Sequence, residues 1–444
     1  LMLGDNDISD ISALSTLNAL EELSLNNNQI GGNISALTGL TNLWNLGLSN
    51  TQIDDVSPLS GLTSMRYLYL SSNQLSDISI LAGLSNLSNL ELGSNQINNI
   101  SAITSLTDLT SLVLSNNQII NISSLSGLTD LRHLNLNDNQ ISDVSVLSGL
   151  VHMEHLCLTN NRISDISSLS GLTDMKYLYL DGNQINDVSA LSGLTGLIVF
   201  KLDYNQVSDI SPLYGLTDLA YLDISGNQLS NISVLSTFTN LGDLFLNANQ
   251  ISDISPLSGL TKLYNIELIG NQISDVTPLS GLTGLTRINI GDNNISDMSP
   301  LSGLTNLNFL YIYGNQLTDI SSLSSLTNID HLTLGNNQIS DISVLSGLNK
   351  LRLLGIDCNQ ITDISPLSGL SELDMLWLND NQITNVSALS GLSKLRMLQL
   401  QENQISDLSG LSGLTSLTTL QAYSNNISDI APLSTLVNLT YLDI

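Results

Sequence analysis

The sequence predicts an α/β solenoid of about twenty stacked repeats, with a parallel β-sheet on one face and short 3₁₀ or helical turns on the other. Three observations predict this fold: a phrase such as NQISDISPLSGLT (249–261) returns along the whole chain, its Asn recurs at fixed spacing, and the apolar residues keep the same phase. From Thr51 to Asn425 every step is 22 residues, and only the step from Asn28 to Thr51 is 23. Residues 1–444 are therefore expected to form a single repeat array.

The first element of each repeat is a short strand. Leu244-Phe245-Leu246 alternates between inward and outward positions, as a strand does, and identical strands stacked turn on turn make a parallel sheet. The core is expected to come from seven apolar positions that recur in nearly every copy, here Leu241, Leu244, Leu246, Ile251, Ile254, Leu257 and Leu260.

The Asn follows the strand where the chain bends inward. Its amide has two donor hydrogens and an acceptor, so it is able to bind backbone groups of its own turn and of the adjacent turn. Stacked copies are therefore expected to form an asparagine ladder that satisfies the bend.

The second element is a single short helical or 3₁₀ turn. All seven prolines fall in one column, and the Ser or Thr before that column is expected to be the N-cap, with Pro at the first helical position. The Asp two residues before this Ser is expected to cap the turn through its carboxylate, although a row of such acids also leaves a calcium ladder open. Five repeats have Asn in this column, each within a formal glycosylation sequence: Asn33, Asn99, Asn121, Asn231 and Asn385.

The charge balance excludes several kinds of ligand. Forty acidic residues against eleven basic ones give a formal charge of −29, which repels nucleic acid and anionic membrane surfaces and favours basic partners. No apolar run reaches the ~18 residues of a spanning helix, so direct membrane insertion is not expected.

The pattern LxxLxLxxNxIxxIxxLxxLxx resembles the leucine-rich repeat, in the 22-residue subclass found in bacterial internalins and in the regulator of type-one protein phosphatase. The resemblance implies a right-handed arc with the sheet on its concave face and partner proteins bound there. The chain contains no GxxxxGK(S/T) and no GxSxG motif, so no enzymatic activity and no cofactor is expected. The chain starts inside a repeat at Leu1 and stops inside one at Ile444, so an uncapped piece of a longer protein is expected.

The outward strand positions carry the candidate binding surface. Ten of the twelve tyrosines fall six, four, two or one residues before the Asn, and although tyrosine favours strands in general, exposed aromatics are typical of binding hot spots. Acids of five successive repeats are expected to form a slanting acidic track beside them, with Lys201 within it, for a partner with a basic patch. The predicted partner-binding residues are Tyr177, Tyr179, Asp181, Lys201, Asp203, Tyr204, Tyr221, Asp223, Asp243, Phe245, Glu267, Phe309, Tyr311 and Tyr313.

A second group of outward residues contains His133, His155 and Cys157. The two histidines occupy one column on adjacent strands, and a pair of His with a Cys could hold a metal or form a nucleophilic pair. Chance placement or partner contact is the preferred interpretation, so no metal ligand and no catalytic residue is predicted. The basic residues mostly lie elsewhere, in a column at the strand's entry: Arg66, Arg132, Lys176, Arg352 and Arg396.

Three functions remain open at this point. The preferred one is a non-enzymatic protein-binding module, extracellular or at the cell surface, for internalin-like recognition or adhesion. The second is a cytoplasmic scaffold or regulatory subunit for a basic protein. The third is a structural array that assembles end to end into a filament or surface layer.

Overall fold

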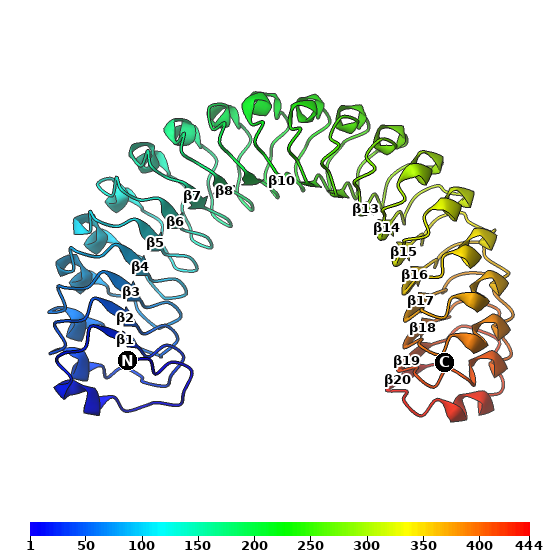
Figure 1. Cartoon of the computed structure of the whole chain (residues 1–444), viewed down its shortest axis with the longest axis horizontal. Helices are drawn as coiled ribbons and strands as arrows, with labels where there is room; N and C mark the ends of the chain where they lie inside the picture. Colours follow the sequence, from blue (N-terminus) through cyan, green and yellow to red (C-terminus); the bar gives the residue numbers. More distant parts are fainter. The chain divides into compact units, whose positions relative to one another are not determined.

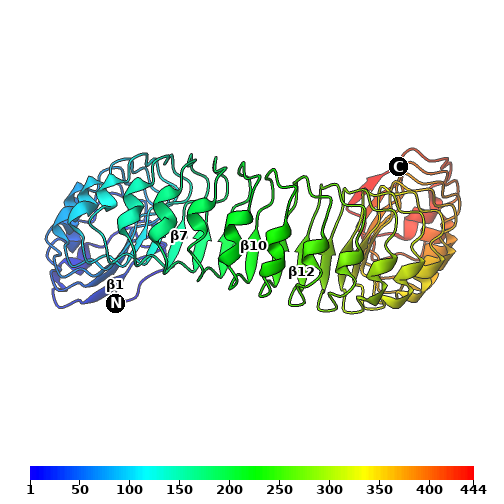
Figure 2. The same cartoon turned by 90° about the horizontal axis from the view of Figure 1, so that it is seen from above.

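The computed structural model describes residues 1–444, which form two compact units, Leu1–Leu219 (unit 1) and Ala220–Ile444 (unit 2). Both units repeat one motif: a three-residue strand, a bend and a short 3₁₀ turn. Within each unit the strands lie on the inner side of the curve and the 3₁₀ turns on the outer side (Figure 1). Seen from above, the turns of neighbouring repeats follow one another on the outer side (Figure 2). The α/β solenoid predicted from the repeat is thus confirmed.

Unit 1 contains nine strands and ten 3₁₀ turns. Each strand pairs in parallel with the strand of the next repeat, in register. The strands are β1 (Glu22–Ser24), β2 (Asn45–Gly47), β3 (Tyr67–Tyr69), β4 (Asn89–Glu91), β5 (Ser111–Val113), β6 (His133–Asn135), β7 (His155–Cys157), β8 (Tyr177–Tyr179) and β9 (Val199–Lys201). The turns are η1 (Ser12–Thr16), η2 (Ser35–Leu37), η3 (Ser57–Leu59), η4 (Ser79–Gly83), η5 (Ser101–Ser105), η6 (Ser123–Leu125), η7 (Ser145–Gly149), η8 (Ser167–Gly171), η9 (Ser189–Leu191) and η10 (Ser211–Gly215).

Unit 2 has the same construction, with eleven strands and ten turns. Its strands also pair in parallel with the next repeat. The strands are β10 (Tyr221–Asp223), β11 (Asp243–Phe245), β12 (Asn265–Glu267), β13 (Arg287–Asn289), β14 (Phe309–Tyr311), β15 (His331–Thr333), β16 (Leu353–Gly355), β17 (Met375–Trp377), β18 (Met397–Gln399), β19 (Thr419–Gln421) and β20 (Tyr441–Asp443). The turns are η11 (Ser233–Thr237), η12 (Ser255–Leu257), η13 (Thr277–Leu279), η14 (Ser299–Gly303), η15 (Ser321–Ser325), η16 (Ser343–Gly347), η17 (Ser365–Gly369), η18 (Ser387–Gly391), η19 (Ser409–Leu411) and η20 (Ala431–Thr435).

The core of each unit is the stack of apolar columns predicted from the repeat. Leu244, at the centre of β11, and Leu257, in η12, are both fully buried, as are the equivalent residues of nearly every other repeat. Each buried leucine or isoleucine contributes about 1.5–3 kcal/mol relative to an exposed one. Because the inward positions are filled in this way, the first and third residues of each strand point away from the core, and most of them are partly exposed.

The bend after each strand is held by the predicted asparagine ladder. The Nδ2 group of Asn249 donates to the carbonyl of Leu246 (3.2 Å) in its own turn and to that of Ile224 (3.0 Å) in the preceding turn. Its Oδ1 accepts a hydrogen bond from the backbone N–H of Leu229 (2.9 Å). Each ladder Asn therefore ties two turns together and satisfies groups that would otherwise be buried without a partner.

Thr51 replaces Asn at the one irregular step of the ladder. It is fully buried, and its hydroxyl donates to the carbonyl of Leu48 (2.6 Å). The preceding turn contains the extra residue and a left-handed Gly31, whose N–H donates to the backbone carbonyl of Thr51 (3.0 Å). The backbone therefore links the irregular turn to the Thr51 turn without an asparagine side chain.

The predicted cap of the 3₁₀ turn is correct for Asp and wrong for Ser. Ser255 is the first residue of η12, and the N-cap, Ile254, makes no side-chain hydrogen bond. The carboxylate of Asp253 instead accepts a hydrogen bond from the Ser255 N–H (2.8 Å). The Asp253 carboxylate already supplies the side-chain acceptor that an N-cap residue would provide. The 3₁₀ turn therefore begins at Ser255, one residue earlier than the position of Pro256 suggested.

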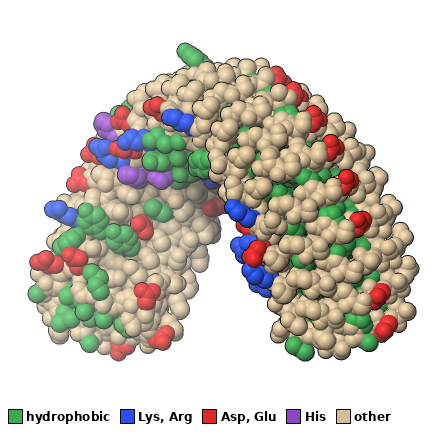
Figure 3. Space-filling model, turned by 45° about the vertical axis from the view of Figure 1, so that its right-hand side comes forward, with side chains coloured by type: hydrophobic (Ala, Val, Ile, Leu, Met, Phe, Trp, Pro, Cys, Tyr) green, Lys and Arg blue, Asp and Glu red, His purple; other side chains and the backbone are tan.

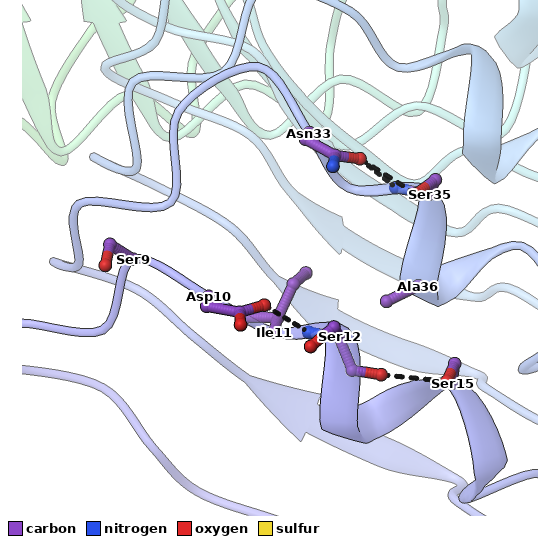
Figure 4. Close-up of a pocket in the computed structure, with 8 residues that line it drawn as sticks. All are labelled: Ser9, Asp10, Ile11, Ser12, Ser15, Asn33, Ser35 and Ala36. Atoms are coloured by element: carbon purple, nitrogen blue, oxygen red, sulfur yellow. Dashed lines mark hydrogen bonds between the residues drawn. The ribbon is translucent and has the colours of Figure 1, made fainter.

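Figure 4 shows this capping in the first two repeats, where Asp10 and Asn33 accept hydrogen bonds from the N–H groups of Ser12 (2.8 Å) and Ser35 (3.2 Å). The two caps line a recess of about 490 Å³ beside the first 3₁₀ turns. All five Asn of this column cap their turns in the same way and are exposed, so their glycosylation stays a prediction.

Candidate functional site

The inner strand face of unit 1 carries a cluster of four ring side chains, His133, His155, Tyr177 and Tyr179, which we call the β6–β8 aromatic cluster. The His155 ring lies 6.0 Å from His133, 5.3 Å from Tyr177 and 5.5 Å from Tyr179, measured between ring centroids. They come together because parallel pairing places His133, His155 and Tyr177 opposite one another on successive strands. Tyr177 is 36% exposed. In Figure 3, histidine side chains lie next to a hydrophobic group on this part of the molecule.

Cys157 lies in the same face, on the strand of His155. It lines a recess of about 170 Å³ together with His133 and His155. Burial, with the nearby Asp181 carboxylate, raises the pKa of the Cys157 thiol to about 11, so the thiol is neutral at pH 7. Burial and the neighbouring His133 lower the pKa of His155. No group of three or more His, Cys, Asp or Glu side chains is arranged to hold a metal ion.

The remaining predicted residues of unit 1 lie where β8 and β9 end. Asp181 accepts a hydrogen bond from the hydroxyl of Thr159 (3.0 Å) on the preceding repeat. Lys201 is the last residue of β9, and Asp203 and Tyr204 follow it in the bend. Tyr204 has a left-handed φ of 52° and is 69% exposed, so it projects from the bend and not from the strand.

The acids that sequence places in unit 2 are already engaged within that unit. Asp223 accepts a hydrogen bond from the N–H of Ser225 (3.0 Å), and Asp243 accepts from Tyr264 and from Asn265 (3.0 Å). These bonds occupy acceptor sites of each carboxylate, while its negative charge remains. A continuous acidic track through the two units stays a prediction.

Four predicted aromatic residues of unit 2 make ring or cation contacts within that unit. The rings of Tyr221 and Phe245 lie 5.2 Å apart on β10 and β11. On β14, Phe309 and Tyr311 share one cation: the guanidinium carbon of Arg287 lies 5.6 Å from the first ring centroid and 5.4 Å from the second. Such contacts are favourable by about 0.5–1 kcal/mol at exposed sites.

Glu267, the last acid of the predicted track, lies beside this Arg287. Its carboxylate accepts a hydrogen bond from Asn247 (3.1 Å) and is 3.6 Å from the Nε of Arg287. Unlike the expected track, the surface here therefore combines an acid, a base and aromatic rings.

Beside this group lies a second recess of about 360 Å³, which we call the Trp377 recess. Tyr311, Thr333, Gly355 and Trp377 stand opposite one another on β14 to β17, so two small residues separate two large rings. The recess is lined by Arg287, Asn289, Tyr311, Tyr313, Thr333, Gly335, Asn336, Asp357 and Trp377.

Sequence reasoning identified only part of the Trp377 recess. Tyr311 and Tyr313 were predicted as aromatic binding residues, whereas Arg287, Thr333 and Asp357 were not. The sequence signal for this recess is the order Tyr311, Thr333, Gly355, Trp377 at one position of four successive repeats. It is visible only when that position is compared between repeats.

Three of the five basic residues at the strand entry, Arg132, Lys176 and Arg396, form ion pairs with acids of the same column. Glu154 bridges Arg132 and Lys176, each at 2.8 Å, and hydrogen bonds from Lys176 and Arg132 lower its pKa to about 2. Arg396 pairs with Asp374 in unit 2. The predicted position of these residues is confirmed, and their charges are partly compensated there.

Family models match most of this chain. The model described as Leucine Rich repeats (2 copies) matches residues 19–61, 41–83, 63–108, 107–149, 151–193, 195–237, 283–325 and 327–369. A second model, Leucine rich repeat, matches residues 350–405. No curated protein matches the sequence. None of the helices is long and apolar enough to cross a membrane.

Solved structures with the same fold include bacterial and plant proteins. The internalin InlF of Listeria monocytogenes is 36% identical, with a TM-score of 0.58, over 77% of this chain and 88% of that chain. InlJ of the same organism is 23% identical, with a TM-score of 0.60, over 78% of this chain and 71% of that chain. The plant peptide hormone receptor RGFR1, in complex with RGF2, is 24% identical with a TM-score of 0.82, over 100% of this chain and 77% of that chain. The last two show similarity of fold alone.

Proposed function

Because this chain belongs to the leucine-rich repeat family and resembles the Listeria internalins, we propose that it is a protein-binding module that recognises its partner on the inner strand face. The proposed activity is binding without catalysis. The proposed setting is extracellular or at the cell surface, for recognition or adhesion. Its similarity to an internalin supports this setting.

The observation that carries the proposal is the β6–β8 aromatic cluster. Tyr177 and Tyr179 are held by strand pairing and by contact with His155, so little side-chain freedom is lost when a partner binds. Their rings are nevertheless partly exposed. Rigid, partly exposed tyrosines on a protein surface are typical hot-spot residues.

The charge of the surroundings supports a basic partner. The whole chain has a formal charge of −29, and Asp181 lies two residues after Tyr179 in the same repeat. A partner with a basic patch would be steered to this face, and its association rate would fall with increasing salt.

A site-specific cross-linking experiment tests the surface. The photoreactive residue benzoylphenylalanine replaces Tyr179 in the full chain, and a second variant carries it at Tyr214, in η10 on the outer side, which is 69% exposed. After irradiation in a total protein extract, we expect a discrete cross-linked protein from position 179 that position 214 does not give. Addition of salt should weaken that product.

A matched double substitution separates contact from folding. Tyr177→Ala with Tyr179→Ala is expected to reduce binding of the cross-linked partner at least tenfold, while Tyr214→Ala leaves it unchanged. Identical products from positions 179 and 214, or unaltered affinity of the double variant, would refute binding through this face.

A further inference from the structure

We propose that the Trp377 recess of unit 2 is a second binding site, for a neutral saccharide. The site lies on strands β13 to β17 and uses residues of unit 2 alone. It goes beyond the protein binding proposed above, which rests on the β6–β8 aromatic cluster of unit 1.

The shape of the recess suits a small ring-shaped ligand. Tyr311 and Trp377 stand three strand spacings apart, or ~14 Å between their Cα atoms, with Thr333 and Gly355 between them. The Trp377 ring leans over Gly355, where an added Cβ would meet a ring carbon at 2.8 Å. The recess is lined by two small residues, Thr333 and Gly335, and by the rings of Tyr311, Tyr313 and Trp377, whereas Gly355 lies under the Trp377 ring. A volume of about 360 Å³ falls at the lower end of the range for small-molecule sites.

The polar groups of the recess favour a neutral ligand. Arg287 and Asp357 line it together, along with the amides of Asn289 and Asn336. An anion would meet the Asp357 carboxylate, and a cation would meet the Arg287 guanidinium. A purely apolar ligand would desolvate all of these groups without replacing their hydrogen bonds. Hydroxyl groups both donate and accept, so a hydroxylated ligand is able to bind acid, base and amides at once.

Unpaired groups within the recess point to the same chemistry. Thr333 is 91% buried, since only 9% of it is exposed, and its hydroxyl has no hydrogen-bond partner. The indole Nε1 of Trp377 is also covered without a hydrogen-bond partner, and the Nε of Arg287 has only the ion pair with Glu267 at 3.6 Å. Buried donors without acceptors are costly, and small side-chain rotations toward ligand oxygens would recover that cost. A sugar also has a C–H face that packs on an aromatic ring, whose π face is electron-rich.

Ligand-observed saturation-transfer NMR on the full chain tests the proposal. The probes are maltotriose, cellotriose and tri-N-acetylchitotriose, with N-acetyl-leucinamide as an amino-acid probe. We expect saturation transfer to at least one of the three sugars, with affinity in the millimolar range. The chain has only two tryptophans, Trp44 and Trp377, so Trp44→Phe makes Trp377 the sole tryptophan and its fluorescence should change on binding.

Three variants assign the signal to the recess. Gly355→Val should displace the Trp377 ring that lies over Gly355 and so abolish transfer, and Trp377→Ala should do the same by removing the ring. Thr333→Val keeps the side-chain volume while removing the hydroxyl, and should weaken binding by up to about tenfold. Trp44→Phe should bind sugar as the native chain does.

Two outcomes would overturn the proposal. One is absence of transfer to all three sugars, including the case in which N-acetyl-leucinamide alone responds, which would assign the recess to a partner side chain. The other is transfer that persists in both Gly355→Val and Trp377→Ala. Neither result bears on cross-linking from Tyr179 in unit 1, so failure of one proposal is distinguishable from failure of the other.

Discussion

Replacement of Asn249 by Ala tests whether the asparagine ladder stabilises the fold as its hydrogen bonds indicate. The substitution removes donors to the carbonyls of Leu246 and Ile224 and the acceptor for the N–H of Leu229. The carbonyl groups keep other donors, since Asn271 also donates to Leu246 (3.0 Å) and Asn227 to Ile224 (3.3 Å). Only the N–H of Leu229, which is fully buried, loses its partner.

The size of the effect follows from this difference. One buried donor without an acceptor costs about 1–3 kcal/mol, and the lost bonds to shared carbonyls add about 1 kcal/mol. Asn249→Ala is therefore expected to lower the free energy of unfolding by about 2–4 kcal/mol. Asn249→Thr should recover little of this loss, because a threonine bonds its own turn as Thr51 does but leaves Leu229 without an acceptor.

Urea unfolding measures the free energy, and amide hydrogen exchange reports on Leu229 itself. The control is Gln250→Ala, which truncates an adjacent exposed amide and should change stability by less than about 0.5 kcal/mol. Unchanged exchange at Leu229 in Asn249→Ala would refute the argument, as would a stability loss no larger than that of Gln250→Ala.

Three further predictions follow from pKa shifts and exposed ion pairs. Hydrogen bonds from the backbone of Ser255 and from Thr277 hold the pKa values of Asp253 and Asp275 below 3.8. The stabilising effect of these carboxylates is therefore present above about pH 4 and is lost as pH falls through the lower folded-state pKa values. Asp253→Asn with Asp275→Asn should flatten the pH dependence of Tm, and an unchanged profile at acid pH would contradict the role of the caps. Burial raises the pKa of Cys157 to about 11 and that of Cys358 to about 12, so both should react with iodoacetamide at pH 8 far more slowly than after unfolding in urea, and equal rates would count against their burial. Glu154→Gln breaks an exposed ion-pair bridge and should alter the free energy of unfolding by less than about 1 kcal/mol, whereas a larger loss in urea unfolding would show that the bridge is structurally important.

The frame was predictable because one repeat unit is tested about twenty times along the sequence. An asparagine that follows a strand at the same distance from buried leucines in nearly every repeat, as Asn249 does, is expected to bond the backbone of the bend, and this is the role it has. The start of the 3₁₀ turn was misplaced for a local reason. Ser255-Pro256 is compatible with either an N-cap or a first-residue position, and the Asx turn of Asp253 decides between them only when the backbone is seen.

The candidate surfaces were less predictable because they depend on which side chains meet. The outward positions of the repeat, counted back from the ladder Asn, placed Tyr177 and Tyr179 on the inner face of unit 1, where the structure has them. Their contacts with His155 follow from strand register. Asp243 was placed in the acidic track without its partners, and the structure joins it to Tyr264 and Asn265. Comparing one position across the repeats does not show which side chains of the adjacent repeat contact it.

The two candidate sites arise from one structural property of the repeat. Tyr179 and Gly355 occupy the same outward column, and the strand residues before them, Leu178 and Leu354, are both fully buried. An outward position can therefore change from the largest to the smallest side chain without disturbing the core beneath it. Where large residues follow one another, as in the β6–β8 aromatic cluster, the face presents rings to a partner. Where small residues interrupt them, as at Thr333 and Gly355, the same face contains a recess. Substitution in this column should thus change what is bound before it changes whether the chain folds.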